Sequence, residues 1–325
     1  MKKKYLPPLL IIGYNRPEKI KNLINTIKKI KGLKNIYFKI DGPKNLKDVK
    51  KIKDVLLIVN KLKRKENLNI NTLIEKKNIG LQKNIINGVD WAFTKEQKLI
   101  ILEDDNIPTK SFFYFCDKML SYYKNNKKIM HISGTCFLPK RDQLDDYYFS
   151  KFPDIVGWAT WKSSWQNNVK SINLKKIITK KILKNYYNIE KADMWFFEYL
   201  YREVINNSSK GLWSTWRVLS IIMNKGYSIS PKKNLVFHDG YYKKDKPEHY
   251  NKKIFYKNTF KLSEMNVANL QKKQLNYKKR YDKIFFKIIE ITDTYFNFIS
   301  QIRSIIRYIL IKINFMKLKT KYFSK

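Results

Sequence analysis

Three consecutive carboxylates, Glu103, Asp104 and Asp105, follow the apolar run at residues 99–102. Like charges held this close repel one another unless a cation or a group of hydrogen-bond donors neutralises them. A hard divalent ion such as Mn2+ or Mg2+ suits this arrangement, because it takes one or two protein carboxylates and completes its shell with water and phosphate oxygens. The acid triplet therefore predicts a metal-supported phosphate site. The alternative is a solvated acidic turn at the start of the next helix.

Two further polar residues follow apolar runs earlier in the chain. Arg16 comes after residues 9–12, where a guanidinium could contact a phosphate or a base. Asp41 follows residues 36–40, where a carboxylate could accept from a base N–H or a ribose hydroxyl. For each taken alone, the alternative is an ordinary loop residue without a ligand. Together with the acid triplet they predict an anion and metal site for a nucleotide.

A parallel sheet would bring these residues to one edge. Apolar runs alternate with amphipathic segments through the first part of the chain, which is typical of an α/β, doubly wound fold with a mostly parallel sheet. Such sheets bind ligands outside the carboxyl ends of their strands. We expect strands near residues 9–12, 36–40, 68–74, 99–102 and 129–132, and helices near 17–30, 46–62, 79–93 and 110–123.

Five short motifs occur in an order that carries a family resemblance. They are IIGYNRP at 11–17, KIDG at 39–42, KNIGL at 77–81, ILEDDNIP at 101–108 and FFYF at 112–115. In this order they resemble the nucleotide-sugar glycosyltransferases of the GT-A fold, in particular the bacterial family 2-like enzymes, including those labelled haemolysin-A-like, and the related animal N-acetylglucosaminyltransferase I. The likeness runs from about residue 9 to 165 and continues more weakly to about 236.

The resemblance implies roles for individual residues. Asp105 resembles the ligand of a Mn2+ or Mg2+ cofactor, and His249 resembles a histidine that closes over the diphosphate or the metal. Trp158 belongs to a Gly-Trp-rich stretch beside the donor sugar in the family, although a Trp-rich stretch is equally a core segment. The implied nucleotide-sugar contacts are Arg16, Asp41, Asn78, Glu103, Asp104 and Trp158.

The catalytic base departs from the family's pattern. Inverting relatives place an Asp in or beside a Trp-flanked motif, and the corresponding stretch here, residues 213–216, reads Trp-Ser-Thr-Trp. A hydroxyl is no general base at neutral pH without a base next to it. Asp239 and Asp193 are the substitutes we predict, with Glu198 as a third. The alternative for each of them is a surface carboxylate. A protein that binds a donor without efficient transfer is the remaining alternative.

The resemblance implies an inverting, metal-dependent hexosyl- or N-acetylhexosaminyltransferase in bacterial cell-surface polysaccharide synthesis. Its donor would be a nucleoside diphosphate sugar, expected to be a UDP-sugar, and its acceptor a hydroxyl of a glycan or a lipid-linked saccharide. We expect a GT-A catalytic domain at residues 1–240, with a nucleotide-sugar half at about 1–135 and an aromatic and helical acceptor half at about 136–240. A basic helical C-terminal extension is expected at 241–325.

The charge of the chain invites a different interpretation. The 325 residues include 68 Lys and Arg against 27 Asp and Glu, a formal net charge of +41. Sixty of these basic residues are Lys and eight are Arg, whereas nucleic-acid readers rely on the forked contacts of Arg. We expect no nucleic-acid partner, with a basic nucleic-acid-binding protein as the alternative. A GT-A-like nucleotidyltransferase is a further alternative, but residues 14–17 are not its usual Gly-rich loop.

The sequence also predicts a compartment. The start of the chain has too short an apolar run for a signal peptide or a membrane span, and the two cysteines show neither disulfide nor zinc spacing. We therefore expect a cytoplasmic protein. Residues 284–316 interleave Lys and Arg with large apolar residues, which predicts peripheral contact with the inner membrane face. Helices packed on the catalytic domain are the alternative.

Overall fold

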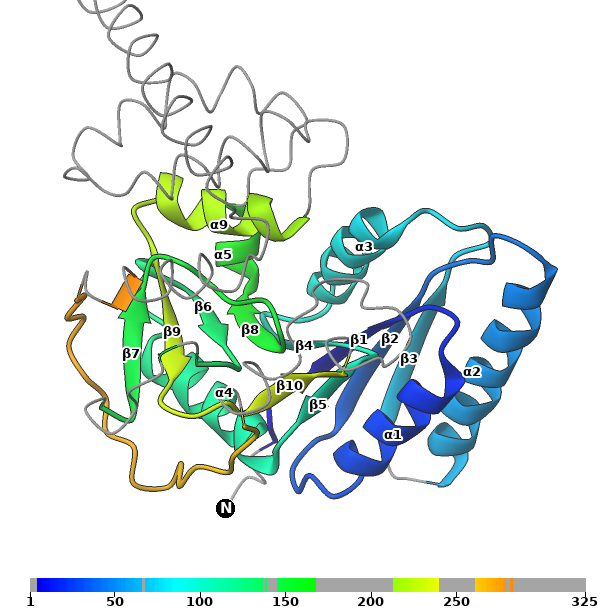
Figure 1. Cartoon of the computed structure of the whole chain (residues 1–325), viewed down its shortest axis with the longest axis horizontal. Coiled ribbons are helices and arrows are strands. Elements are labelled where there is room, and N and C mark those ends of the chain that lie inside the picture. Colours follow the sequence, from blue (N-terminus) through cyan, green and yellow to red (C-terminus); the bar gives the residue numbers. More distant parts are fainter. Residues whose placement is uncertain are drawn as a thin grey trace, which may run out of the picture.

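A mixed sheet of eight strands lies at the centre of the protein, in the order β3-β2-β1-β4-β8-β6-β9-β7 (Figure 1). The structure is a computed structural model, and it describes residues 5–65, 68–136, 138, 145–167, 213–239, 261–278 and 281–282. The strands are β1 (Leu9–Gly13), β2 (Asn35–Ile40), β3 (Asn69–Ile74), β4 (Lys98–Glu103), β6 (Ile129–Ser133), β7 (Tyr147–Ser150), β8 (Trp158–Trp161) and β9 (Tyr227–Pro231).

The first half of the sheet is parallel, as predicted. Strand β1 pairs in parallel with both β2 and β4, and β2 pairs in parallel with β3. Beyond β4 the sheet becomes mixed, because β8 runs antiparallel between β4 and β6, and β7 runs antiparallel to β9. Strands β6 and β9 are parallel. The expected α/β class and mostly parallel sheet are therefore confirmed, with an antiparallel insertion that the sequence pattern did not predict.

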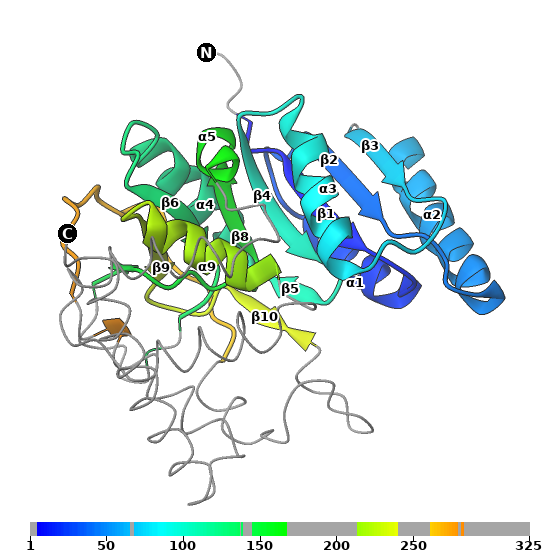
Figure 2. The same cartoon turned by 90° about the horizontal axis from the view of Figure 1, so that it is seen from above.

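Helices cover both faces of the sheet (Figure 2). One face packs on α1 (Pro17–Ile27), α2 (Leu46–Lys65) and α4 (Lys110–Tyr122), and the other on α3 (Leu81–Phe93), α5 (Lys162–Gln166) and α9 (Trp213–Met223). Alternate side chains of β1 divide between these layers, since Leu9 and Ile11 join the first and Leu10 and Ile12 the second. This burial on both faces explains why β1 reads as a continuous apolar run.

The Trp-rich segment forms a central strand rather than an exposed platform. Trp158 of β8 is 1% exposed. Its indole stacks on the ring of His131 at 5.1 Å and on that of Trp213 at 5.6 Å, measured between ring centroids. Trp213 belongs to α9, and His131 to β6, the strand that pairs with β8. Trp158 is thus a core residue whose ring faces are covered, and its position does not suit the predicted contact with a donor sugar.

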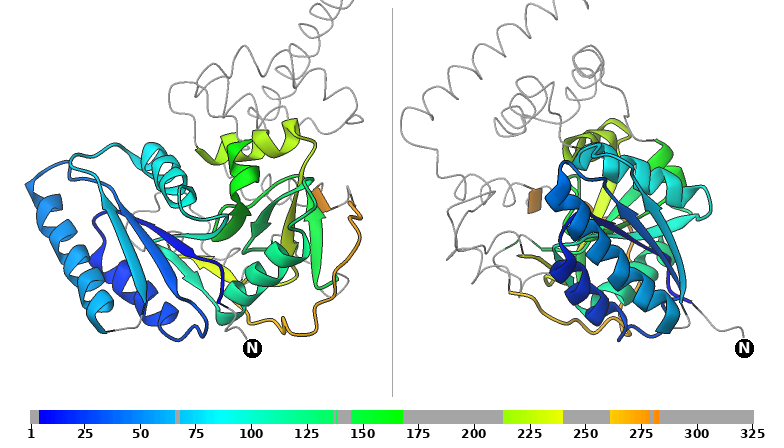
Figure 3. Two further views of the ribbon diagram at one scale, coloured as in Figure 1. Left: turned by 180° about the vertical axis from the view of Figure 1, so that it is seen from behind. Right: turned by 90° about the vertical axis from the view of Figure 1, so that its right-hand side faces the viewer.

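Residues 261–278, which we call the strap, are not helical, contrary to the expectation for the C-terminal extension. Figure 3 shows the strap in orange, running around the β7 edge of the sheet. Side chains of the domain bind its backbone carbonyls: Tyr122 donates to the carbonyl of Leu270 at 2.8 Å, and Tyr123 to that of Lys273 at 2.8 Å. These hydrogen bonds hold the backbone of the strap against the domain.

Both ends of this described region are held by carboxylates. Near the start of the strap, Glu264 accepts from the backbone N–H groups of Lys110 and Ser111 at 3.0 and 2.9 Å, and so caps α4. Beyond the strap, Asp282 accepts from Ser150 of β7 at 2.5 Å and from Tyr277 at 2.6 Å. The strap is therefore an integral layer of the domain.

None of the helices within the described ranges is both long enough and apolar enough to cross a bilayer.

A buried carboxyl between β7 and β8, that of Asp154, makes the free energy of unfolding depend on pH. Burial raises the pKa of Asp154 to about 7, although backbone N–H groups of Val156 and Ile155 oppose the shift. The folded protein then holds a proton that the unfolded chain releases above about pH 4, so the free energy of unfolding falls as the pH rises from about 4 to about 7. We expect Asp154→Asn to stabilise the protein by about 2 kcal/mol at pH 8 and by much less at pH 4. Urea unfolding at both pH values checks this, and an equal effect at both would contradict it.

Candidate functional site

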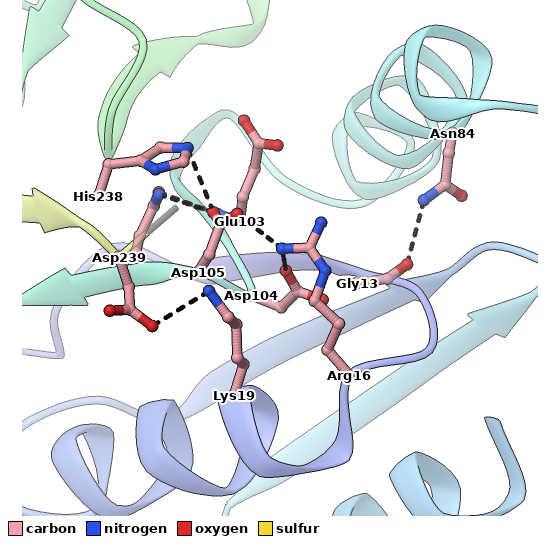
Figure 4. Close-up of polar contacts among 10 residues, drawn as sticks. Gly13, Arg16, Lys19, Asn84, Glu103, Asp104, Asp105, His238 and Asp239 are labelled. Carbon is pink, nitrogen blue, oxygen red and sulfur yellow. Dashed lines mark hydrogen bonds and ion pairs between the residues drawn. The ribbon is translucent and has the colours of Figure 1, made fainter. Parts of the chain in front are cut away.

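The acid triplet lies at the point where the strand order of the sheet reverses. From β1 the chain proceeds outward to β2 and β3, and then returns to place β4 on the other side of β1. The carboxyl ends of β1 and β4 therefore flank a topological switch point, the usual place for a ligand in an open α/β sheet. Arg16 follows β1, and Asp104 and Asp105 follow β4, so all three meet at this edge (Figure 4).

The pleat of β4 divides the acid triplet between two sides. Alternate residues of a strand face opposite layers, so Glu103 points to the side of α3, away from Arg16 (Figure 4). Asp104 extends the strand, with its N–H bonded to the carbonyl of Ile12 at 2.9 Å, and turns its carboxylate to the side of α1. The three carboxylates therefore do not converge on one point, which reduces their mutual repulsion.

Arg16 joins the two aspartates. Its Nη1 lies 2.6 Å from Oδ2 of Asp105 and 3.0 Å from Oδ1 of Asp104. The aspartate side chains are 9% and 5% exposed, whereas that of Arg16 is 39% exposed. Oδ2 of Asp104 is buried and has no hydrogen-bond partner. The site thus combines fixed, buried acceptors with a cationic side chain that reaches solvent.

The three carboxyls differ in their protonation. Burial, together with repulsion from Asp105 and Asp104, raises the pKa of Glu103 to about 8. Burial also raises the pKa of Asp104, to about 6, because the attraction of Arg16 offsets it only in part. Burial acts in the same direction on Asp105, but His238 and Arg16 outweigh it and lower the pKa of that carboxyl. At neutral pH Asp105 is therefore the firmly ionised member, while Glu103 holds a proton.

A long-range strand pair adds two residues to this edge. Strand β5 (Asn106–Pro108) pairs antiparallel with β10 (Val236–His238), and His238 lies opposite Asn106. Nε2 of His238 is 3.6 Å from Oδ1 of Asp105, and the N–H of Asp239 donates to the carbonyl of Asp105 at 2.9 Å. Burial lowers the pKa of His238 and outweighs the attraction of Asp105. A largely uncharged imidazole therefore stands beside the ionised carboxylate.

Asp239, a predicted catalytic residue, lies on the side of α1. Its carboxylate is 46% exposed and forms an ion pair with Lys19 of α1 at 3.1 Å. Sequence reasoning missed both Lys19 and the position of His238. Lys19 is one of sixty lysines, and His238 is brought in by a pairing between residues about 130 positions apart, which leaves no local pattern.

Asp41 and Asn78 meet each other at the neighbouring strand end. Oδ1 of Asp41 accepts from the N–H groups of Gly42 and Ile79 at 2.8 and 2.9 Å. Oδ2 accepts from Nδ2 of Asn78 at 3.0 Å and from the N–H of Gly80 at 3.1 Å. A carboxylate has about four acceptor positions, and all are used. Asp41 therefore shapes the loop before α3.

We expect Asp41→Asn to destabilise the protein by about 3 kcal/mol, because the new amide group would face two N–H donors and leave them unpaired. Urea unfolding measures the change, with Asp145→Asn as the control, since the side chain of Asp145 is 63% exposed. A loss no larger than that of the control would contradict this structural role.

Three predicted residues, Asp193, Glu198 and His249, lie outside the described residues. The motif at 213–216 begins helix α9, and its Trp213 is 5% exposed against Trp158. The first residue of this motif, Trp213, is therefore a core residue. Of the predicted set, the structure brings Arg16, Asp104, Asp105 and Asp239 together, with Glu103 on the opposite side of the strand.

The chemistry of the donor set suits a hard divalent ion shared with a ligand. Asp105 is ionised, and Asp104 offers a buried oxygen without a partner. Among the residues that the structure describes, no three His, Cys, Asp or Glu side chains are grouped to hold a metal. An ion here would thus take one or two carboxylates from the protein and its other ligands from phosphate oxygens and water, as Mg2+ commonly does.

Comparison with known proteins yields little at the level of sequence. No protein-family model matches the chain, and no curated protein matches it significantly. Among solved structures, it is similar to the "Mannosyltransferase PcManGT from Pyrobaculum calidifontis in complex with GDP-Man and Mn2+", with 10% identity and a TM-score of 0.34. The match covers 49% of this chain and 45% of that protein, less than half of the latter's length.

Proposed function

We propose that this chain is a metal-dependent glycosyltransferase that moves a sugar from a nucleoside diphosphate sugar, specifically a UDP-sugar, to a hydroxyl of a glycan or lipid-linked saccharide. One observation carries the proposal: Arg16, Asp104 and Asp105 converge at the switch point between β1 and β4. Ionised carboxylates beside a guanidinium match the needs of a diphosphate accompanied by a divalent cation.

The residues of the site divide this work. Arg16, with a planar fork of donors, suits the diphosphate, and Lys19 adds a second positive charge from α1, the helix that follows Arg16. Glu103, protonated at neutral pH, can donate a hydrogen bond to a ribose or base oxygen. Asp41 and Asn78 support the loop beside the nucleotide. A Mn2+ or Mg2+ ion at Asp105 would supply charge stabilisation for the leaving diphosphate.

In this proposal a carboxylate acts as the general base that accepts the proton of the acceptor hydroxyl. Asp239 is accessible and adjoins the site, since its N–H bonds to the carbonyl of Asp105. Accepting the proton of the attacking hydroxyl would require it to exchange its ion pair with Lys19 for the acceptor. Asp193 remains a second proposed base, and His249 a proposed neighbour of the diphosphate. The proposed reaction inverts the configuration at the sugar carbon. The proposed role is in cell-surface polysaccharide synthesis, with peripheral membrane contact through residues 284–316.

Calorimetric titration of the full chain with UDP, GDP and ADP, each with and without Mn2+, tests the proposal. We expect micromolar binding of UDP in the presence of Mn2+ and binding at least about tenfold weaker without it, which corresponds to about 1.4 kcal/mol. Release of UDP from a panel of UDP-sugars then identifies the donor. Absence of binding for all three diphosphates, with and without Mn2+, would reject the proposal.

A further inference from the structure

In this structure the cation at the two aspartates is supplied by the chain itself. A single nitrogen, Nη1 of Arg16, lies 2.6 Å from Asp105 and 3.0 Å from Asp104. The oxygen that it approaches most closely, Oδ2 of Asp105, belongs to the carboxylate best suited to a divalent ion. A guanidinium and a metal ion on the same carboxylate would repel each other strongly, because only a few ångströms would separate them.

The anions of this cluster are buried and joined to the sheet edge by backbone hydrogen bonds, whereas the cation is carried by a side chain that reaches solvent. Backbone hydrogen bonds hold Asp104 to Ile12 and Asp105 to Asp239, both at 2.9 Å. Arg16 stands at the N-cap of α1 with non-helical backbone angles, φ −118° and ψ 75°, and its side chain makes no capping hydrogen bond. Its side chain is also 39% exposed. The bonds that join Asp104 and Asp105 to their neighbours, and the bond from the N–H of Ile20 to the carbonyl of Arg16, are all between backbone groups and do not involve the guanidinium.

We propose that Arg16 is an exchangeable counter-ion: it closes the divalent-cation site in the nucleotide-free protein and transfers to the diphosphate when the donor binds. The inference rests on the proposed function, because it concerns the same site and ligand. Removal of the guanidinium uncovers Asp104 and Asp105 for the ion, so the ion and the nucleoside diphosphate bind with positive coupling. Arg16 acts here as a positioning residue that sets the order in which the site fills.

Mn2+ affinity in the absence of nucleotide tests this directly. Calorimetry and the paramagnetic resonance of free Mn2+ would compare the full-length wild-type chain with Arg16→Gln, Arg16→Lys and Lys21→Gln. Lys21 is the matched control, because it lies on the same helix with its side chain 57% exposed and pairs with Glu18. We expect Arg16→Gln to bind Mn2+ at least about tenfold more tightly than wild type, since a positive charge has left the two carboxylates. Arg16→Lys and Lys21→Gln should stay within about twofold of wild type.

The same variants should respond in the opposite sense to UDP. Arg16→Gln is expected to bind UDP more weakly, and UDP should tighten Mn2+ binding by a larger factor in wild type than in this variant. Chelation of Mn2+ by UDP is common to both proteins and cancels in that ratio. Asp105→Asn, alone and combined with Arg16→Gln, should remove the Mn2+ site in both backgrounds.

The outcomes separate the two proposals. If Arg16→Gln binds Mn2+ no more tightly than wild type while UDP still binds, the counter-ion role is overturned and the proposed function stands. If no protein in the series binds Mn2+ or UDP, the proposed function fails with it. Should Arg16→Gln not fold, Arg16→Ala replaces it, and an equal effect of UDP on Mn2+ affinity in that variant and in wild type overturns the inference.

Discussion

Replacing Asp105 with Asn is expected to lower Mn2+-dependent transfer from a UDP-sugar at least about 100-fold, because the firmly ionised carboxylate of the site would become neutral. The fold should survive this change. The backbone carbonyl of residue 105 still accepts from Asp239, and Arg16 keeps its ion pair with Asp104 at 3.0 Å. Release of UDP measures the activity, and circular dichroism with thermal unfolding measures the fold.

Asp145→Asn is the matched control for this experiment, because it removes the same charge from a side chain that is 63% exposed and lies on the strap side of the domain. It should retain the activity of the wild type. Full activity in Asp105→Asn would remove the carboxylate from the proposed mechanism, and with it the assignment of the acid triplet.

The second large effect concerns the C-terminal region. Removal of residues 261–325 deletes the strap and Asp282, and we expect a chain that does not fold stably. The deletion exposes α4 and removes Glu264, which caps that helix. It also removes several hydrogen bonds and the core side chain of Leu270, which is 1% exposed. At about 1 kcal/mol for each hydrogen bond and about 2 for the leucine, the loss approaches the whole stability of a domain.

Removal of residues 283–325 provides the comparison, because it keeps the strap and Asp282. Thermal unfolding should place this shorter truncation well above the longer one, because it retains the contacts of Glu264, Leu270 and Asp282 with the domain. An equally large loss in both truncations would contradict the structural role of the strap. The shorter truncation also serves to test membrane contact, since its flotation with anionic liposomes can be compared with that of the full chain without loss of the domain.

The part of the fold that follows from local pattern could be predicted from the sequence. Strands β1 to β4 and β6, and the helices α1 to α4 between them, lie where the alternation of apolar runs and amphipathic segments predicts them, and the acid triplet lies where β4 ends. Strand β5 was not predicted. The convergence of Arg16 with Asp104 and Asp105 follows from parallel strand ends meeting at one edge. The elements follow from local pattern and the convergence follows from a general property of parallel sheets, so neither requires knowledge of a particular distant contact.

The remaining features depend on distant partners. Trp158 reads equally as a ligand platform or a core residue until β8 is seen inserted between β4 and β6. The sequence of the strap shows neither helical nor strand periodicity. Its backbone is held by hydrogen bonds from tyrosines at the end of α4 and in β7. Asp41 was predicted to contact a nucleotide from its place after a strand, and its four donors are visible only once the loop at 78–80 is packed.

The pairing of β5 with β10 has a consequence for the order of events during synthesis. Arg16, Asp104 and Asp105 leave the ribosome early, whereas His238 and Asp239 reach them only after more than 130 further residues have been made. Closing so long a loop is slow compared with forming the local crossovers of the first four strands. The nascent chain can therefore build the parallel half of its sheet well before it has a complete site, and any activity of this site should appear only once residue 239 has emerged and docked.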